Sequence, residues 1–348
     1  MPALCVIQGD GIGREVIPAA TTVLRHVMPD LTLVEARAGW ETFLECGEAA
    51  PAETLAAVRL CGAALFGAVS SPSYKVDGYR SAILTIRQEL DLYANIRPVR
   101  SLPNVGLHHN VNLVIVRENT EGLYSGRESG DSSRATAERV ITRFASFRIG
   151  RKAIEILQAG HYRKLTIVHK ANILPISDGL FRNCVREAIE GSMDHLGGFE
   201  VEDMLVDTAA YRLASTPWHF DVIVTTNLFG DILSDVAACW GGGLGMVPSI
   251  NLGDALALAE PVHGSAPDIA GQGVANPVAA ILSGALIARY YWKQEQVAQR
   301  IERAVDYVMR NHLPFSERGV TPLVSTQKIL DLILQAIDAL EFVDSDRS

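Results

Sequence analysis

The sequence predicts an α/β fold, and three observations lead to this prediction. Short apolar runs alternate with amphipathic helical segments along the chain, as strands and helices do in α/β proteins. Several of these runs end in charged or polar residues, at the strand ends where open α/β sheets bind ligands. The 348 residues exceed what one core usually serves, so we expect two lobes, and a hydrophobic content of 48% supports both.

The composition excludes several classes of protein. A formal net charge of −9 without a basic run argues against a nucleic-acid partner. The five cysteines are scattered and show no Cys-x-x-Cys spacing, so we expect neither disulfides nor a zinc site, and a reducing cytoplasm fits best. No apolar run reaches membrane-spanning length, and no targeting segment precedes the first apolar run. We therefore expect a soluble cytoplasmic protein without a membrane partner.

The N-terminal region begins with an apolar strand at 4–7, followed by GDGIG at 9–13 and an amphipathic helix. This order is similar to a dinucleotide-binding fingerprint, but the place of its third glycine is taken by Val16. We therefore do not assign the fingerprint, and a tight turn between strand and helix accounts for the glycines.

Further elements follow in chain order. Strands are expected at 31–36, 63–69, 111–116, 165–168, 204–207 and 221–226. Helices are expected at about 51–60, at 145–158, at 297–310 and at 326–340. Another helix is expected from Ser81 onward, with Pro98 as a helix-stopping residue. The polar stretch 125–140 predicts a projecting arm, and the long loop 260–277 has a length that is usually functional.

The stretch 221–240 is the one around which we interpret the rest of the chain. Its strand leads through a turn with Asn227 and Gly230 into a helix that carries Asp231 and Asp235. Four residues apart, these carboxylates project from one helix face and repel each other. A hard divalent cation that prefers oxygen ligands would relieve this repulsion. The alternative is a solvated first turn that complements the helix dipole.

Basic residues also lie near the ends of apolar elements. Arg87, Arg97 and Arg117 make a plausible carboxylate clamp, although each alone is more often a surface ion-pair partner. Lys170 follows a buried strand, where partial burial would lower its pKa and suit a general base. A lysine that extends to solvent is the alternative. Asp207 is expected at the end of another strand.

Six motifs, taken in order and spacing, resemble the isocitrate/isopropylmalate dehydrogenase family of metal-dependent β-decarboxylating dehydrogenases. They are GDGIG at 9–13, the segment 81–98, RENTEGLY at 117–124, HKANIL at 169–174, TTNLFGDILSD at 225–235 and EPVHGSAPDIAGQGVANP at 260–277. Two segments, AGWETF at 38–43 and HKANILPISDGLF at 169–181, look most like the homoisocitrate dehydrogenase branch.

The resemblance implies a fold of two domains with a central cleft, distinct from the Rossmann fold. Residues 1–95 and 244–348 would form the large cofactor-binding domain, and residues 96–243 the small domain with the dimer interface and the arm. It also implies a homodimer, which could pair into a tetramer, with shared active sites. Lys170 and Asp207 would enter each site from one subunit. The other subunit would supply Arg87, Arg97, Arg117, Tyr124, Asp231 and Asp235.

The resemblance further assigns roles to residues. Tyr124 and Lys170 would be catalytic, and Asp207, Asp231 and Asp235 would bind Mg2+ or Mn2+. The substrate-binding residues would be Ser81, Ile83, Leu84, Arg87, Arg97, Arg117, Asn172 and Ile173. The cofactor-binding residues would be Glu260, His263, Gly264, Ser265, Ala266, Asp268, Ile269 and Asn276. The reaction would be oxidation of a 3-substituted malate, with Lys170 as base, followed by loss of CO2 and protonation of carbon 3 by Tyr124.

Two choices within the family, the cofactor and the substrate, rest on a few positions. Asp268 would hydrogen-bond the adenosine ribose and repel a 2′-phosphate, which favours NAD over NADP. An Asp that caps the following turn is the alternative. Ile83, Leu84 and Ile173 would form an apolar wall, which favours the alkyl group of 3-isopropylmalate.

Homoisocitrate or isocitrate is the close alternative substrate, because Arg80 and Ser81 could reach a distal carboxylate. A catalytically silent regulatory subunit is a remote alternative. Such a subunit would be expected to lack a metal aspartate, Lys170 or Tyr124, and all of these are present.

Overall fold

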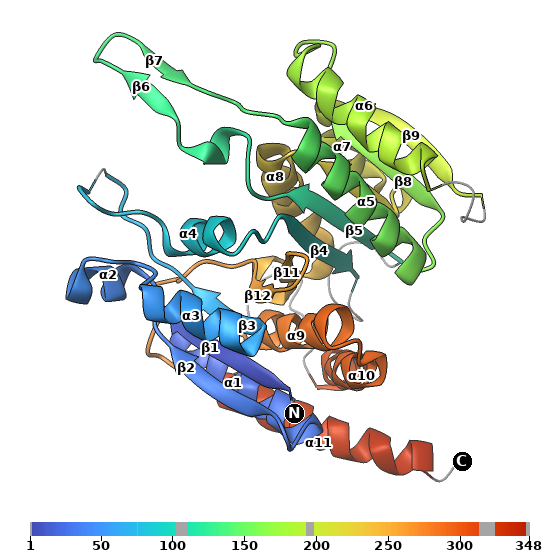
Figure 1. The fold of residues 1–348 in the computed structure, drawn as a ribbon. Helices are drawn as coiled ribbons and strands as arrows, with labels where there is room; N and C mark the ends of the chain where they lie inside the picture. Colours follow the sequence, from blue (N-terminus) through green and yellow to red (C-terminus); the bar gives the residue numbers. More distant parts are fainter. Residues whose placement is uncertain (1, 75, 102–109, 193–197, 313–323, 346–348) are drawn as a thin grey trace. The chain divides into compact units, whose positions relative to one another are not determined.

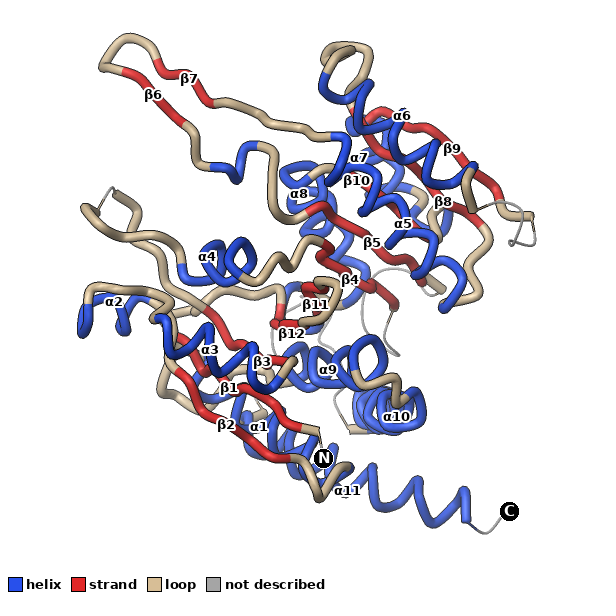
Figure 2. The backbone as a smooth tube through the Cα atoms, viewed as in Figure 1, coloured by secondary structure: helices blue, strands red, loops and turns tan. Residues whose placement is uncertain are grey.

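The computed structural model describes the chain apart from residues 1, 75, 102–109, 193–197, 313–323 and 346–348 (Figure 1). The chain forms two compact α/β units, each with its own strands and helices (Figure 2). The first unit is built from Met1–Leu90 and Trp240–Ser348, and the second from Asp91–Arg100 and Asn110–Cys239. The predicted α/β fold is confirmed.

The first unit contains five neighbouring strands in the order β2-β1-β3-β12-β11. Their bounds are Thr32–Ala36, Ala3–Gly9, Ala63–Ala68, Ala257–Pro261 and Pro248–Leu252. β1 pairs in parallel with β2 and β3, β12 runs parallel to β3, and β11 runs antiparallel to β12. All residues of β3 are buried, as its continuous apolar run predicts.

Helices cover both faces of this sheet, and in Figure 1 α3 lies in front of it and α1 behind. The helices of the unit are α1 Gly13–Val27, α2 Trp40–Cys46, α3 Ala52–Cys61, α4 Ala82–Glu89, α9 Val278–Leu286, α10 Glu295–Asn311 and α11 Thr326–Ser345. The sequence analysis missed α2 and α9. Every residue of α9 is buried, so this helix is apolar all round and shows no amphipathic period.

The GDGIG turn is explained by close backbone contacts. Gly9 and Gly11 have φ angles of +72° and +56°. A Cβ atom on Gly9 would lie 2.0 Å from the carbonyl oxygen of Ala68, and one on Gly11 would lie 2.1 Å from that of Ser265. Only glycine fits at these two positions, which is the tight-turn interpretation of the motif.

The second unit contains five strands in the order β4-β5-β10-β8-β9. Their bounds are Ala94–Arg100, Asn112–Glu118, Val222–Thr225, Lys164–His169 and Glu200–Leu205. β4 and β5 are antiparallel, and the other pairs are parallel. The helices are α5 Arg143–Ala159, α6 Ser177–Glu190, α7 Val206–Ser215 and α8 Asn227–Ala238.

The polar stretch after Tyr124 forms an exposed hairpin. Its strands β6 (Glu128–Gly130) and β7 (Ala135–Ala137) pair antiparallel, and all of their residues are exposed. Figure 1 shows this arm extending away from the rest of its unit. At its base, the Gly122 amide donates to the Val140 carbonyl at 2.9 Å.

Three local predictions were wrong. Asn227 and Gly230 lie within α8, because the helix begins directly after Thr226 instead of following a turn. Asp207 lies in the first turn of α7 and not at a strand end, because β9 ends at Leu205.

Pro98 does not stop a helix, since α4 already ends at Glu89 and Pro98 lies within β4. In the part of the chain that the structure describes, no helix is both long and apolar enough to span a membrane.

Candidate functional site

One face of α8 gathers polar side chains in the second unit. Asn227, Asp231, Ser234 and Asp235 follow the spacing of one helix face. Two neighbouring strands each contribute an arginine to this face. Arg97 lies on β4, and Arg117 lies on β5. We call these residues, together with Asn95 and Tyr124, the α8 cluster.

Arg117 is almost fully buried, with a side chain that is 1% exposed. Its Nε and Nη2 atoms donate to Oδ1 of Asn227 at 2.9 and 2.7 Å, and its Nη1 forms an ion pair with Asp231. The stem of the arginine passes over Gly230, where a Cβ atom would lie 2.6 Å from Cγ of Arg117. Glycine at this position therefore lets the arginine lie flat on the helix.

Arg97 approaches the same helix from β4, with a side chain that is 8% exposed. Its Nε donates to Oδ1 of Asn95 at 2.7 Å, and its Nη1 donates to Oγ of Ser234 at 2.6 Å. Its guanidinium also lies 3.4 Å from Oδ1 of Asp231 and 3.5 Å from Oδ1 of Asp235. The structure thus brings two of the three predicted clamp arginines together.

Within this chain, the two arginines provide positive charge beside the paired carboxylates. They do so from the buried side, while the side chains of Asp231 and Asp235 remain 35% and 57% exposed. Burial raises the pKa of Asp235, an effect that Arg97 opposes and Asp231 reinforces. The exposed carboxylate oxygens are the donors that Mg2+ and Mn2+ prefer.

Tyr124 completes the cluster from the short helical turn η1 (Leu123–Ser125). Its hydroxyl donates to Oδ2 of Asp231, and the guanidinium carbon of Arg117 lies 5.0 Å from the centre of its ring. Burial and the hydrogen bond to Asp231 raise the pKa of Tyr124. The phenol therefore stays protonated at neutral pH and can act as a proton donor.

Lys170 and Asp207 form an ion pair of their own, from the end of β8 and the first turn of α7. Their side chains are 25% and 63% exposed. Within a single chain, the described residues contain no group of three metal-binding side chains, so Asp207 does not join Asp231 and Asp235 there. The segment after Lys170 is exposed at Asn172 and Ile173, the latter to 67%.

The third predicted clamp arginine lies in the first unit. Arg87 on α4 is buried, and its Nη2 forms an ion pair with Oε1 of Glu260 at 2.7 Å. Nδ2 of the Asn251 side chain donates to the same oxygen at 2.7 Å. Arg87, predicted to bind the substrate, is therefore paired with Glu260, predicted to bind the cofactor. Ser81, Ile83 and Leu84, at the start of the same helix, are half-buried.

The loop after β12 holds the other predicted cofactor residues. Ser265 anchors it: its carbonyl accepts from the Ile12 amide at 2.9 Å, and its hydroxyl accepts from Ser70 at 2.9 Å. Ala266 has a φ angle of +38°, and its carbonyl accepts from the Ile269 amide at 3.2 Å. These contacts fix the loop against the GDGIG turn.

Three further side chains of this loop have distinct environments. Nδ1 of His263 lies 2.9 Å from the carbonyl oxygen of Gly264, and burial lowers the pKa of this histidine, so its ring is neutral at pH 7. Oδ1 of Asn276 accepts a hydrogen bond at 3.0 Å from the amide of Val278, the first residue of α9. Asp268 is exposed.

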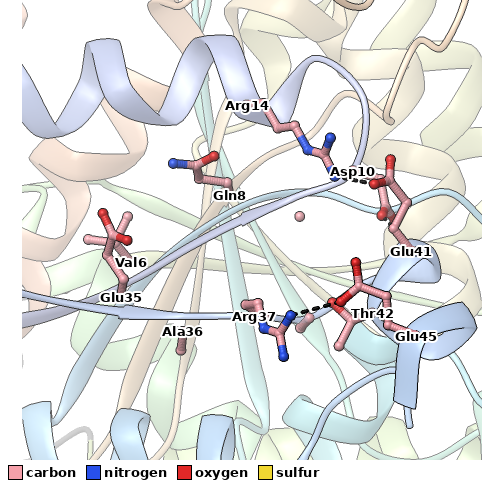
Figure 3. A pocket seen from close by; sticks show the side chains of 12 residues that line it. Val6, Gln8, Asp10, Arg14, Glu35, Ala36, Arg37, Glu41, Thr42 and Glu45 are labelled. Carbon is pink, nitrogen blue, oxygen red and sulfur yellow. Dashed lines mark hydrogen bonds and ion pairs between the residues drawn. The ribbon is translucent and has the colours of Figure 1, made fainter. Parts of the chain in front are cut away.

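A separate cavity of about 470 Å³ lies in the first unit, between β1, β2, α1 and α2 (Figure 3). None of the predicted site residues lines it. Two arginines on its walls are paired with neighbouring carboxylates, Arg14 with Glu41 and Arg37 with Glu45. Asp10 and Glu35 also line this cavity, so carboxylates outnumber arginines and the lining keeps a net negative charge.

The sequence analysis missed three members of the α8 cluster. Asn227 was assigned to a turn, and Ser234 and Asn95 were not considered. The sequence did contain a sign of Asn227 and Ser234. Together with Asp231 they lie at helical spacing if the helix begins at Asn227, as it does in the structure. Asn95 gave no such signal, because its role depends on the position of β4 beside α8.

Paired carboxylates beside two buried arginines, on an α/β scaffold, define a class of protein that binds an anionic ligand next to a cation. Comparison with known proteins makes this more specific. The family model described as isocitrate/isopropylmalate dehydrogenase matches residues 3–333, so the chain belongs to this family. It is a β-decarboxylating dehydrogenase, an oxidoreductase, and enzymes of the family act on hydroxy acids with NAD(P) and a divalent metal.

Individual relatives match over nearly the whole chain. The isocitrate/homoisocitrate dehydrogenase of Thermus thermophilus is 48% identical over 337 residues, covering 97% of this chain and 99% of the relative. The 3-isopropylmalate dehydrogenase of Methanothermobacter thermautotrophicus is 45% identical over 317 residues, covering 91% and 93%. The crystal structure of isocitrate dehydrogenase from Methylococcus capsulatus matches with a TM-score of 0.90 and 38% identity, covering 97% and 99%.

Proposed function

We propose that the chain catalyses NAD-dependent, divalent-metal-dependent oxidative decarboxylation of a malate that carries a carboxylate-bearing group on carbon 3, as in isocitrate and homoisocitrate. The α8 cluster is the observation that carries this proposal. It supplies two buried arginines for the carboxylates of the malate core and two partly exposed aspartates for a cation. In this proposal, Arg87 adds a third guanidinium from α4.

The donor set fits a hard divalent ion. Asp231 and Asp235 would hold Mg2+ or Mn2+, with Asp207 supplied by a second subunit. A bound ion of this kind would lower the pKa of the substrate hydroxyl and polarise the carbonyl that forms from it. NAD would accept the hydride.

The proton transfers fall to two side chains of this protein. Lys170, once its amine is neutral, takes the proton of the substrate hydroxyl. Tyr124 gives a proton to carbon 3 after CO2 has left, and its raised pKa keeps that proton available at neutral pH. Arg97 and Arg117 hold the carboxylates in place during both steps.

A homodimer with shared active sites is part of the proposal. Two observations support it. Lys170 and Asp207 pair with each other and do not join Asp231 and Asp235 in a metal-sized group among the described residues of one chain. The segment after Lys170 also exposes apolar side chains, with Ile173 at 67% and Ile176 at 88%. Such side chains are expected to be covered by another protein surface.

The choice of substrate rests on the comparisons and on Arg80. The relative with 48% identity is an isocitrate/homoisocitrate dehydrogenase, which favours a third carboxylate over the isopropyl group that the apolar wall suggested. Arg80 supports this choice: its guanidinium reaches along α4 and donates to Gln88. Leu84 and Gln88 are four residues apart on one helix face, so this cation lies near Leu84, where the homoisocitrate-type arginine would be.

3-Isopropylmalate is the second candidate, because Ile83, Leu84 and Ile173 are apolar and a methylene buried against them contributes about 0.8 kcal/mol. NADH formation with Mn2+ should be measured on isocitrate, homoisocitrate, 3-isopropylmalate and tartrate. We expect the highest kcat/KM with one of the two tricarboxylates. Arg80→Gln should lower kcat/KM for that acid by ~10-fold, as loss of a charge-assisted hydrogen bond does, and leave 3-isopropylmalate unaffected.

Each result of this panel is decisive. Preference for 3-isopropylmalate would establish the second candidate, and an equal effect of Arg80→Gln on all acids would remove Arg80 from specificity. The absence of turnover on every acid would contradict the proposed function. Arg25→Gln, on the exposed side of α1, is a matched control and should change no rate.

The proposed preference for NAD follows from the exposed carboxylate of Asp268. It would accept hydrogen bonds from the ribose hydroxyls and repel a 2′-phosphate. We expect Asp268→Asn to reduce the ratio of kcat/KM for NAD to that for NADP by ~10-fold or more, since it removes the repelling charge. An unchanged ratio would mean that Asp268 does not select the cofactor.

A further inference from the structure

A fully buried carboxylate supports the backbone beside Lys170. Asp178, in the first turn of α6, is 0% exposed. Its Oδ2 accepts a hydrogen bond from the Lys170 amide at 2.6 Å. A buried ionised carboxylate requires a charged partner, because an uncompensated charge in the interior is strongly destabilising.

That partner is Arg139, which lies where the arm returns to its unit. Its Nη1 forms an ion pair with Oδ1 of Asp178, and its side chain is 15% exposed. Its Nη2 donates to Oγ1 of Thr226 at 3.1 Å, and its guanidinium carbon lies 5.1 Å from the ring centre of Phe229. Its Nη1 also donates to Oγ of Ser177 at 3.3 Å, so four contacts hold Arg139: an ion pair, two hydrogen bonds to hydroxyls and an aromatic ring.

We propose that Arg139 and Asp178 are positioning residues that hold the backbone at Lys170 so that its amine reaches the substrate hydroxyl. The proposal rests on the proposed function, in which Lys170 is the general base. The geometry forms a short chain from the arm, through Arg139 and Asp178, to the Lys170 amide. Proton transfer depends steeply on the position of the base, and a misplacement of about 1 Å can lower a rate ~100-fold.

The position of Arg139 also connects two sites. Thr226 and Phe229 belong to the beginning of α8, the helix that carries Asp231 and Asp235. In the proposed dimer, those aspartates and Lys170 of the same chain serve different active sites. Arg139 therefore contacts α8, which would bind the metal of one active site. It also contacts Asp178, which holds the backbone of Lys170 for the other active site.

The test uses the full-length enzyme with four variants: Arg139→Gln, Asp178→Asn, the double variant and Arg143→Gln. Arg143 is the matched control, because it pairs with Glu187 through side chains that are 62% and 49% exposed. Each single variant leaves one buried charge without its ion-pair partner, and the double variant removes both charges. The double variant therefore distinguishes a loss of stability from a loss of positioning.

We expect Arg139→Gln and Asp178→Asn to lower kcat by ~100-fold while KM for NAD stays within about twofold, because the cofactor loop is untouched. The double variant should recover the thermal stability of the wild type but not its kcat. The control should match the wild type. Recovery of kcat in the double variant, or single variants with wild-type kcat, would overturn the proposal.

A second measurement does not depend on turnover. Hydrogen exchange at the Lys170 amide, measured by mass spectrometry, should become faster in Asp178→Asn and in the double variant, because the hydrogen bond from that amide is weakened or lost. Unchanged exchange would contradict the support by Asp178. If the wild type turned over none of the acids, the proposed function would fail, and this exchange measurement would still decide whether the support exists.

Discussion

Replacement of Lys170 by methionine is expected to lower kcat by ~10²- to 10⁴-fold, the usual contribution of a general base. Methionine keeps much of the length and apolar volume of the side chain but cannot accept a proton. The variant also frees Asp207 from its ion pair, but the side chain of Asp207 is 63% exposed and water can solvate the freed carboxylate. The measurement is NADH formation under saturating Mn2+, NAD and substrate.

Two controls make the Lys170 result interpretable. The affinity for NAD should be unchanged, because the predicted cofactor residues lie in the other unit. Lys328→Met, on the exposed side of α11, should retain the wild-type rate. A kcat for Lys170→Met within a few-fold of the wild type would show that another group removes the proton.

The substitution Asp235→Asn is expected to weaken Mn2+ binding by ~100-fold or more, because an amide is neutral and a carboxylate is the preferred ligand of a hard cation. Asp235 is a cleaner choice than Asp231, whose loss would also remove the ion pair of Arg117 and the hydrogen bond of Tyr124. Isothermal titration with Mn2+ measures the affinity directly. The rate should recover in part at high Mn2+.

The matched control for this prediction is Asp331→Asn on α11, which should bind Mn2+ as the wild type does. Removal of the metal with EDTA should abolish turnover of the wild type, and added Mn2+ should restore it. Wild-type Mn2+ affinity in Asp235→Asn would exclude this aspartate as a ligand and would weaken the assignment of the α8 cluster as the metal site.

Much of the scaffold could be predicted from the sequence, because strands such as Ala63–Ala68 are continuous apolar runs and helices such as Glu295–Asn311 have one apolar face. The helix that supports Lys170, Ser177–Glu190, was missed although it has an amphipathic face. A proline, Pro175, lies just before it, and the sequence analysis considered the segment 169–181 only for its motif. The all-apolar helix Val278–Leu286 was missed because it lacks a period.

The residues of the α8 cluster could be predicted from the sequence only in part. Asp231 and Asp235 are close in sequence, so their proximity follows from the helix alone. Arg97 and Arg117 were predicted to cooperate only from their places near element ends. Their convergence on α8 depends on the antiparallel pairing of the two strands that carry them, which spacing along the chain cannot specify.

The sequence by itself determined the α/β class, the family and the residue types that the chemistry needs, because these follow from local periodicity and from motifs of adjacent residues. Only the tertiary structure decided which of these residues meet. It joined Arg87 to Glu260, Lys170 to Asp207 and Arg139 to Asp178. The physical reason is that such contacts connect residues far apart in the chain, and the packing of strands and helices fixes them.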